Sequence, residues 1–325
     1  LSHESAVRAM IARVDTSTLK EKPAERWVME NRGLAGAGAF SPDGAWLYVA
    51  MRGSRSIERF DLKKGVQSGT ILDVGYTPDA VAVTRDGRWL VAVASSSRTF
   101  ITWRLPPFGP LPKVPSKSYS LVTKEPLPAN VLRGKQLFND SFDPRLAGDG
   151  YIACAHCHLD AESDKRTWDF TDRGEGMRNT PTLHGRAGMS HGPVHWSANF
   201  DEIQDFENDI RTHFGGKGLL NDANFAATKA TIGKKKAGLS EDLDALAAYV
   251  SSLQRYPRSP FRAASGTLTS SAQRGKKLFE SSSLGCTTCH AGAHLTDSAL
   301  KDGKPLLHDV GTLGPGSGKR LGGAL

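Results

Sequence analysis

The sequence predicts a multidomain protein in which a partial all-β segment is followed by two mainly α-helical domains. Three observations predict this fold class. Strand-like stretches with turn signals repeat near the N-terminus, a proline-rich stretch follows them, and a helix-like stretch leading into a cysteine and histidine motif occurs twice in the remainder. At 325 residues and 35.0 kDa, the chain is long enough for two or three small domains.

The first segment, residues 1–105, contains two similar stretches, 38–50 and 80–92, in which strand-forming residues flank an Asp-Gly turn. The turn glycines, Gly44 and Gly87, lie 43 residues apart. Propeller blades repeat at about this period, so we expect a partial β-propeller. A closed propeller needs about four to eight blades, and the segment has room for two or three, which favours a chain cut from a longer protein. A small β-sandwich or meander is the alternative.

Residues 106–127 are expected to form an extended linker. Prolines recur along this stretch, together with several lysines. Proline-rich sequences favour extended, semi-rigid conformations over helices and central strands. The linker would separate the β-segment from the remainder of the chain.

The remainder is organised around a C-x-x-C-H motif that occurs twice and uses all of the cysteines. The residues are Cys154, Cys157 and His158 in the first motif and Cys286, Cys289 and His290 in the second. This motif is typical of covalent haem c attachment. The two thiols lie one helical turn apart and bond to one haem, and the following histidine becomes the proximal iron ligand. The sequence therefore predicts two covalently bound haem c groups.

Other uses of the cysteines fit the sequence less well. A zinc site built from two C-x-x-C pairs has them close together in sequence, whereas these pairs lie far apart and each carries its own histidine. A thioredoxin-like site needs one C-x-x-C beside a βαβ pattern, which we do not find. Disulfide bonds between the two motifs stay open as an alternative.

A further repeat predicts two tandem cytochrome c domains, 128–258 and 259–325. Residues 133–138 and 274–279 share the pattern Arg-Gly-Lys-x-Leu-Phe, and each run precedes a C-x-x-C-H motif. We also expect a helix at 240–253, where apolar residues recur at spacings of three and four. Few residues follow the second motif, so we expect the second domain to be incomplete at its C-terminus.

The composition limits the partners and the location. The formal net charge of +8 comes from scattered Lys and Arg, which predicts no nucleic-acid binding and favours an acidic redox partner. No stretch is apolar enough to span a membrane. Because haem is attached to C-x-x-C-H outside the bacterial cytoplasm, we expect a periplasmic or extracytoplasmic protein. The start at Leu1 indicates a mature or partial sequence.

Residues 128–325 resemble the bacterial di-haem cytochrome c peroxidase and MauG superfamily. The resemblance is carried by the two C-x-x-C-H motifs, the Arg-Asn-Thr-Pro run that contains Asn179 and the His-Trp pair that contains Trp196. The strand repeats of residues 7–105 resemble YVTN-type propeller repeats. The family resemblance implies that Trp196 relays electrons between the haems and that Asn179 ligates a calcium ion between the domains.

The resemblance leaves the distal groups of both haems open. Family members close the resting first haem with a histidine in the loop after the first motif, whereas no histidine occurs here between His158 and His184. The family's distal glutamate also lies further past the tryptophan than the glutamates do here. The candidates for the distal or catalytic group at the first haem are Met177, His191, His195, Glu202 and Glu207. For the second haem we expect His308, which is within loop reach of the iron.

These observations predict an exported di-haem c-type cytochrome that acts as a peroxidase-like oxidoreductase. Electrons from a small cytochrome or cupredoxin would enter at the 286–290 haem, pass Trp196, and reduce hydrogen peroxide or oxidise a protein partner at the 154–158 haem. The alternative is a non-catalytic electron-transfer protein, or a redox subunit of a larger assembly, that uses the propeller as a docking platform. A third alternative places a separate substrate or metal site in the β-segment. That segment contains no cluster of histidines or acidic residues that would support such a site.

Overall fold

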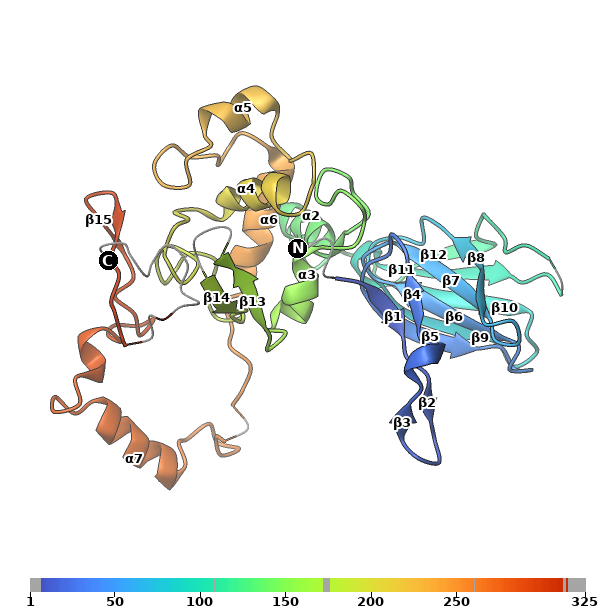
Figure 1. The fold of residues 1–325 in the computed structure, drawn as a ribbon, viewed down its shortest axis with the longest axis horizontal. Helices are drawn as coiled ribbons and strands as arrows, with labels where there is room; N and C mark the ends of the chain where they lie inside the picture. Colours follow the sequence, from blue (N-terminus) through green and yellow to red (C-terminus); the bar gives the residue numbers. More distant parts are fainter. Residues whose placement is uncertain (1–6, 108, 172–175, 260, 312–313, 315–325) are drawn as a thin grey trace.

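The strands of the chain gather at one end of the molecule and most of the helices at the other (Figure 1). The structure is a computed structural model that describes residues 7–107, 109–171, 176–259, 261–311 and 314. Its N-terminal part consists mostly of strands in separate small sheets, and a helical part follows. This order agrees with the fold class expected from the sequence.

Two four-stranded antiparallel sheets form the body of the β-part. The first contains β5 (Ala35–Phe40), β6 (Trp46–Met51), β7 (Ser56–Asp61) and β8 (Val66–Ile71). The second contains β9 (Pro78–Val83), β10 (Trp89–Ala94), β11 (Thr99–Arg104) and β12 (Lys117–Ser120). In both sheets the strands follow one another in sequence order, as they do in a propeller blade.

The two sheets also share the turn chemistry that the sequence repeat indicated. In the first, the Ser41 hydroxyl donates a hydrogen bond of 2.6 Å to Asp43, and in the second the Thr84 hydroxyl donates one of 2.6 Å to Asp86. The glycine that follows each aspartate has a φ of +68°, which favours glycine. Each sequence repeat therefore corresponds to one four-stranded sheet.

The remaining N-terminal strands form two small pairs. They are β1 (Ala9–Ile11) with β4 (Trp27–Met29), and β2 (Val14–Asp15) with β3 (Lys20–Glu21). The β1–β4 pair packs on the first sheet, where the Trp27 ring stacks on Phe60 at a centroid distance of 4.9 Å. The described strands form two four-stranded sheets, fewer than a closed propeller needs, so closure into a propeller stays a prediction.

The expected linker differs in part from the structure. Residues Lys117–Ser120 form β12, which pairs with β11 and completes the second sheet. This short run contains no proline and includes Tyr119, so its backbone can supply the hydrogen bonds of an edge strand. Proline composition alone therefore overestimated the extent of the linker.

The helical part contains short helices and two small hairpins. The helices are α2 (Ala129–Asn139), α3 (Cys154–Cys157), α4 (Phe206–Thr212), α5 (Asp222–Ala227), α6 (Glu241–Ser252) and α7 (Ser270–Phe279). The hairpins are β13 (Thr167–Phe170) with β14 (Gly176–Asn179), and β15 (Leu300–Lys301) with β16 (Lys304–Pro305). The helix expected at 240–253 is α6, and the Ser240 side chain caps it by accepting a hydrogen bond from the Leu243 backbone.

Packing of α2 against α6 forms the core of the helical part. Their shared cluster includes Leu137, Phe138, Leu246 and Tyr249, all buried. Gly134 lies at the crossing, where a Cβ atom would sit only 1.8 Å from the Ala245 carbonyl oxygen. The glycine is therefore required for the close approach of the two helices.

The β-part and the helical part are joined by arginine contacts. The Arg52 guanidinium lies 2.8 Å from Asp79 on β9 and 2.9 Å from Asp160, just after the first C-x-x-C-H motif. Arg133 on α2 donates two hydrogen bonds of 2.7 Å to Asp242 on α6, and one of 3.1 Å to the Tyr76 hydroxyl. Bidentate pairs of this kind fix orientation as well as distance.

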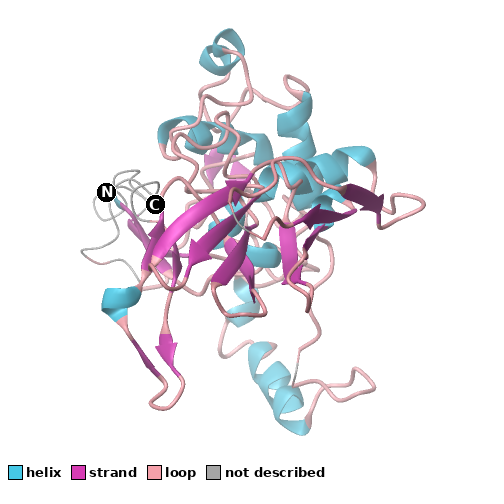
Figure 2. Cartoon of the chain, turned by 90° about the vertical axis from the view of Figure 1, so that its right-hand side faces the viewer, coloured by secondary structure: helices cyan, strands magenta, loops and turns pink. Residues whose placement is uncertain are grey.

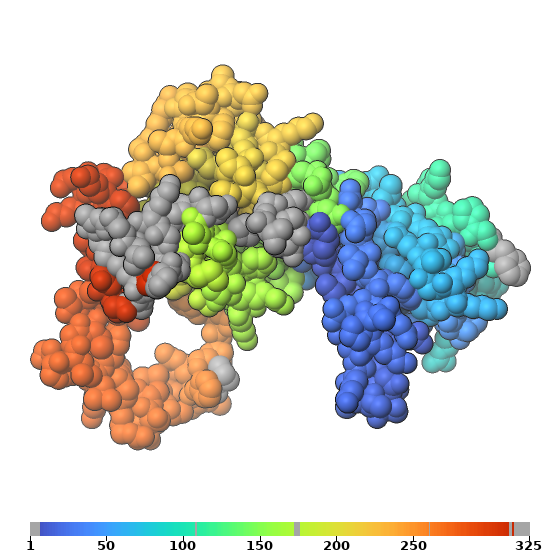
Figure 3. Space-filling view, viewed as in Figure 1, coloured from blue at the N-terminus to red at the C-terminus, as the bar shows by residue number. Residues whose placement is uncertain are grey.

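The region around the second motif has a different character. None of the residues of α7 is buried, and α7 projects from the rest of the chain (Figure 2). Figure 3 shows open space between α7 and the first haem region. Among the described residues, no helix combines the length and the hydropathy that a membrane crossing would need.

Candidate haem sites

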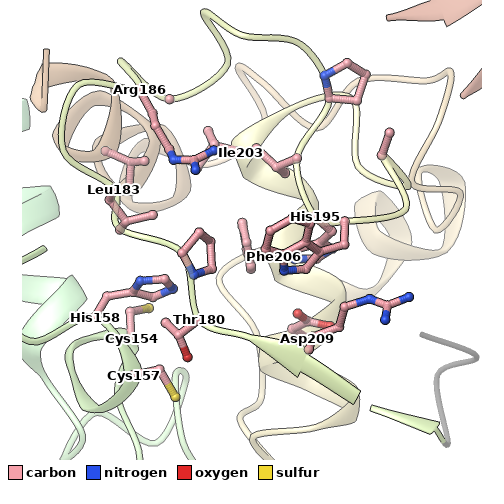
Figure 4. Close-up of a pocket in the computed structure, with 18 of the residues that line it drawn as sticks. Cys154, Cys157, His158, Thr180, Leu183, Arg186, His195, Ile203, Phe206 and Asp209 are labelled. Atoms are coloured by element: carbon pink, nitrogen blue, oxygen red, sulfur yellow. The ribbon is translucent and has the colours of Figure 1, made fainter. Parts of the chain in front are cut away.

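The first C-x-x-C-H motif forms one wall of an apolar cavity of about 470 Å³. Cys154 and Cys157 begin and end the single turn of α3, and the backbone N–H of His158 donates a hydrogen bond of 3.0 Å to the Cys154 carbonyl. This turn brings both thiols and the imidazole to the same wall (Figure 4). Phe138 of α2 packs against the imidazole at a ring distance of 6.5 Å.

Burial shifts the pKa values of His158 and Cys154. It lowers the pKa of His158 to about 4, so the imidazole is neutral at pH 7. It raises the pKa of the Cys154 thiol to about 12. A neutral imidazole has a lone pair for iron, and protonated thiols are the form that adds across vinyl groups. The donor set and the size of the cavity therefore fit a covalently bound haem c.

Most of the cavity wall is apolar. The apolar side chains that line it include Leu183, Ile203, Phe206, Leu243, Leu246 and Val250. Polar groups also line it, among them Arg186, His191, His195 and Asp209. An apolar pocket with a few convergent polar groups is the usual form of a cofactor site.

The second motif repeats the local geometry of the first. Cys286 opens the turn η6 (Cys286–Thr288), and the N–H of His290 donates a hydrogen bond of 3.0 Å to the Cys286 carbonyl. Phe279 of α7 lies 6.2 Å from the His290 ring. The His290 Nδ1 lies 3.0 Å from the Leu295 carbonyl oxygen, which leaves Nε2 to face an iron.

The second site is open where the first is enclosed. Three leucines around it, Leu278, Leu284 and Leu295, are between 55% and 61% exposed. Apolar side chains gathered around a C-x-x-C-H motif would be covered by the haem itself. The donor set and these leucines therefore fit a second haem c.

Comparison with known proteins identifies the family of the region that contains the first motif. Residues 128–266 match the family model of the di-haem cytochrome c peroxidase. This part of the chain belongs to that peroxidase family. The family has covalently bound haem c, as the two cysteine motifs indicate.

Relatives of the chain include two kinds of curated protein. It is 30% identical over 229 residues to the hydrazine synthase subunit gamma of Kuenenia stuttgartiensis, covering 68% of this chain and 59% of that protein. It is 30% identical over 217 residues to the cytochrome-c peroxidase IdrP1 of Denitromonas iodatirespirans, covering 60% of this chain and 54% of that protein. The chain thus spans little more than half the length of these relatives.

The solved structures that are similar to this chain include one of hydrazine synthase from Kuenenia stuttgartiensis, pressurized with xenon. A chain of that structure is 26% identical, with a TM-score of 0.38 over 53% of this chain and 54% of that one. A TM-score this low does not establish a common overall arrangement.

Two of the candidates for the distal group of the first haem, His191 and His195, line the cavity of this peroxidase-family domain. His195 lies across the cavity from His158 (Figure 4). The His195 Nδ1 lies 2.7 Å from the Asn199 side-chain oxygen, and its ring packs on Phe200 and Phe206 at 4.3 and 5.1 Å. With Nδ1 donating to Asn199, the lone pair is on Nε2. These contacts fix both the tautomer and the orientation of the ring.

His191 also lines the cavity but is engaged by another wall residue. Arg186 Nη1 lies 2.7 Å from the His191 Nε2, so the imidazole accepts this hydrogen bond. Burial, followed by the charge of Arg186, lowers the pKa of His191. A neutral His191 that already accepts from an arginine is less suited than His195 to bind an iron.

The glutamates expected as distal candidates lie outside the cavity wall. Glu202 accepts hydrogen bonds from the backbone N–H groups of Lys236 and Ala237. Glu207 accepts from the backbone of Leu219 and Leu220 and from the Arg211 guanidinium. Both are buried, and both carboxylates hold loops together. The lining residues likewise do not include Met177, which is 46% exposed on β14.

Asp209 is a wall residue that the sequence analysis did not single out. It lies on α4, is 5% exposed, and lines the cavity with Phe206 and Ile210. The His213 Nε2 lies 3.8 Å from its carboxylate. One signal was present in the sequence, because residues 206, 209, 210 and 213 share one face of a helix. An acidic residue within an apolar stripe marks a buried carboxyl.

Trp196 and Asn179 are neighbours at the cavity. The Trp196 ring N–H donates a hydrogen bond of 3.0 Å to the Asn179 backbone carbonyl, and both residues line the cavity. Trp196 is 57% exposed. Among the described residues, the one group of three His, Cys, Asp or Glu ligand atoms close enough to hold a metal ion consists of Cys289, Asp297 and His308. The calcium site stays a prediction.

His308, expected near the second haem, lies between the two sites. Its Nε2 lies 2.8 Å from Asp297, and ligand atoms of both residues are within 4.8 Å of the Cys289 sulfur. Both also line the cavity of the first motif. These three residues are a poor metal site, because attachment of a haem would convert the Cys289 thiol into a thioether.

Proposed function

We propose that the chain is part of an exported di-haem peroxidase-like oxidoreductase in which the 154–158 haem is the catalytic site and the 286–290 haem transfers electrons. The observation that carries this proposal is the enclosed cavity. It places His195 and the buried carboxyl of Asp209 opposite the proximal His158. Peroxide reduction requires such groups, whereas the exposed second motif suits exchange of electrons with a partner.

Reduction of hydrogen peroxide consumes two electrons and two protons and gives two water molecules, and the haem iron supplies the site where the O–O bond breaks. The chain has to move a proton from one peroxide oxygen to the other. Asp209 is the group we assign to this step, because its carboxyl is held inside the apolar wall. His195, with its lone pair on Nε2, is a second acceptor or a sixth iron ligand.

Trp196 is the proposed electron relay between the haems. It lies at the cavity and is held by its hydrogen bond to Asn179. We retain Asn179 as the proposed calcium residue, and a small acidic cytochrome or cupredoxin as the electron donor. A periplasmic location follows from the covalent haem chemistry. The relative that is a subunit of hydrazine synthase supports membership of a larger assembly.

The alternative is an electron-transfer protein without catalysis, in which the β-part is a docking platform. One observation favours it. Contacts with Asn199, Phe200 and Phe206 hold His195 rigidly, as a permanent sixth ligand of the first haem would be held. Two strong axial ligands would close that haem to peroxide.

Electron paramagnetic resonance of the half-reduced protein, before and after hydrogen peroxide, separates the two functions. We expect a high-spin ferric signal that peroxide converts. Asp209→Asn should slow this conversion about 100-fold or more, while the control Asp222→Asn should not, because the Asp222 side chain is 96% exposed. If both haems are low-spin and their signals do not change with peroxide, the peroxidase function is excluded and the electron-transfer function remains.

A further inference from the structure

The second haem region touches the first through one tight backbone contact. At Gly192, in the loop between His191 and Pro193, a Cβ atom would lie 2.3 Å from the backbone carbonyl oxygen of Ser298. The φ of Gly192 is +99°, a conformation that also favours glycine. Two backbones therefore meet at this point, with no room for a side chain between them.

This contact holds a segment of the second region over the cavity of the first. Thr296, Asp297 and Ser298 line that cavity on one side of the β15–β16 hairpin, and Leu306, Leu307 and His308 line it on the other. The backbone of Leu306 donates a hydrogen bond of 2.9 Å to Ala299, which joins the two arms. Figure 1 shows the hairpin folded back beside the first haem region, far from α7.

The segment contributes a polar pair at the cavity mouth. The Nε2 of His308 lies 2.8 Å from Asp297, and the two side chains are 41% and 33% exposed. Partial exposure indicates that the pair lies where the cavity meets solvent. The flanking Leu306 and Leu307 also line the cavity, and Leu306 is 36% exposed, so the segment contributes both apolar and polar side chains to the cavity mouth.

We propose that residues 296–308 form a lid on the first haem cavity, seated on Gly192, and that this lid controls the entry of small neutral molecules such as hydrogen peroxide. His308 then belongs to the entrance of the first haem site, instead of acting as a ligand of the second haem. The proposal deepens the proposed function and rests on it, because it presumes that the first haem admits a ligand from solvent.

The test is the rate of cyanide binding to the first haem of the half-reduced, full-length protein, followed by its absorption spectrum. Gly192→Val places a side chain against the Ser298 carbonyl, which should displace the lid and raise the association rate roughly tenfold. The matched control is Gly238→Val. Gly238 has a similar φ of +82°, but nothing lies within 4 Å of its Cβ position, so the rate should stay unchanged.

A second pair of variants avoids backbone strain. His308→Ala removes one side chain from the cavity mouth and should also raise the cyanide rate, whereas Lys301→Ala, an exposed position on the same hairpin, should not. Intact mass verifies that each variant carries both haems. Equal rates in all proteins, the absence of binding included, would overturn the lid. Cyanide rates that differ as expected without any peroxide turnover would keep the lid and reject the peroxidase.

Discussion

The two haem motifs of this chain share a local geometry but differ in what surrounds them. In both, a phenylalanine at the end of a short helix packs on the proximal histidine, at 6.5 Å in the first and 6.2 Å in the second. In both, the histidine N–H closes the cysteine turn with a hydrogen bond of 3.0 Å. The first unit is enclosed by core residues, whereas α7 of the second has no buried residue.

The glycines of the two repeats make the difference explicit. Gly134 and Gly275 occupy the same position of the Arg-Gly-Lys-x-Leu-Phe repeat. A Cβ at Gly134 would overlap the Ala245 carbonyl, while nothing lies within 4 Å of that position at Gly275. The residues of the repeat and the motif therefore determine the haem-attachment unit by themselves, whereas the packing around it requires a partner helix such as α6.

The largest expected effect comes from removing the attachment cysteines of each unit in turn. Cys154→Ala with Cys157→Ala should remove one haem and also abolish cooperative unfolding of the first haem region, because the haem fills its cavity. Cys286→Ala with Cys289→Ala should remove one haem and leave that unfolding transition unchanged. Intact mass and thermal unfolding followed by circular dichroism measure both outcomes. If both double variants lost cooperative unfolding of the first haem region equally, the two motifs would not differ in how they support that core.

Ion pairs of the two regions should differ in the same direction. Lys236 and Asp205 are both fully buried, 2.6 Å apart, whereas Lys276 and Glu280 are 3.6 Å apart and more than half exposed. Lys236→Met should lower the free energy of unfolding by about 3–5 kcal/mol, since it leaves a buried carboxylate unpaired. Lys276→Met should change it by less than about 0.5 kcal/mol.

Denaturant unfolding measures these two ion-pair variants, and a double variant serves as the control. Replacing both buried partners, as Lys236→Met with Asp205→Asn, should recover much of the loss, because no uncompensated charge remains and the asparagine oxygen can still accept from the backbone of Asp201 and Glu202. A double variant as unstable as Lys236→Met alone would mean that the lysine acts through packing, not through its charge.

Substitutions at the two repeat glycines should have opposite signs. Gly134→Ala should cost about 3 kcal/mol, because the added methyl overlaps a backbone carbonyl in a packed core. Gly275→Ala should stabilise α7 by about 0.5–1 kcal/mol, because alanine favours an exposed helix. Circular dichroism during denaturant unfolding follows both. Destabilisation by Gly275→Ala would indicate that another helix packs on α7 in the functional protein.

Local patterns of the sequence predicted local structure well. The helix expected at 240–253 is present as α6, and the strand repeat corresponds to two four-stranded sheets. The turn glycines and the C-x-x-C-H spacing belong to this class too. In each case the residues that determine the conformation lie within a few positions of one another.

Features that depend on distant segments were not predicted. Strand β12 was not predicted, because it lies in a proline-rich stretch and is held extended by its pairing with β11. Glu202 and Glu207 were candidates for the distal group of the first haem, yet their carboxylates accept hydrogen bonds from backbone N–H groups of the 219–220 and 236–237 loops. Composition and spacing carry no information on where those loops fold. The roles of the cavity residues stay predictions.

Packing around the first motif bears on the order of events during biogenesis. Cys154 is half-buried and lines a cavity whose other walls include α4 and α6, so we expect haem attachment there to be fastest before those helices pack. At the second motif, α7 has no buried residue, so we expect haem attachment there to depend less on the state of folding.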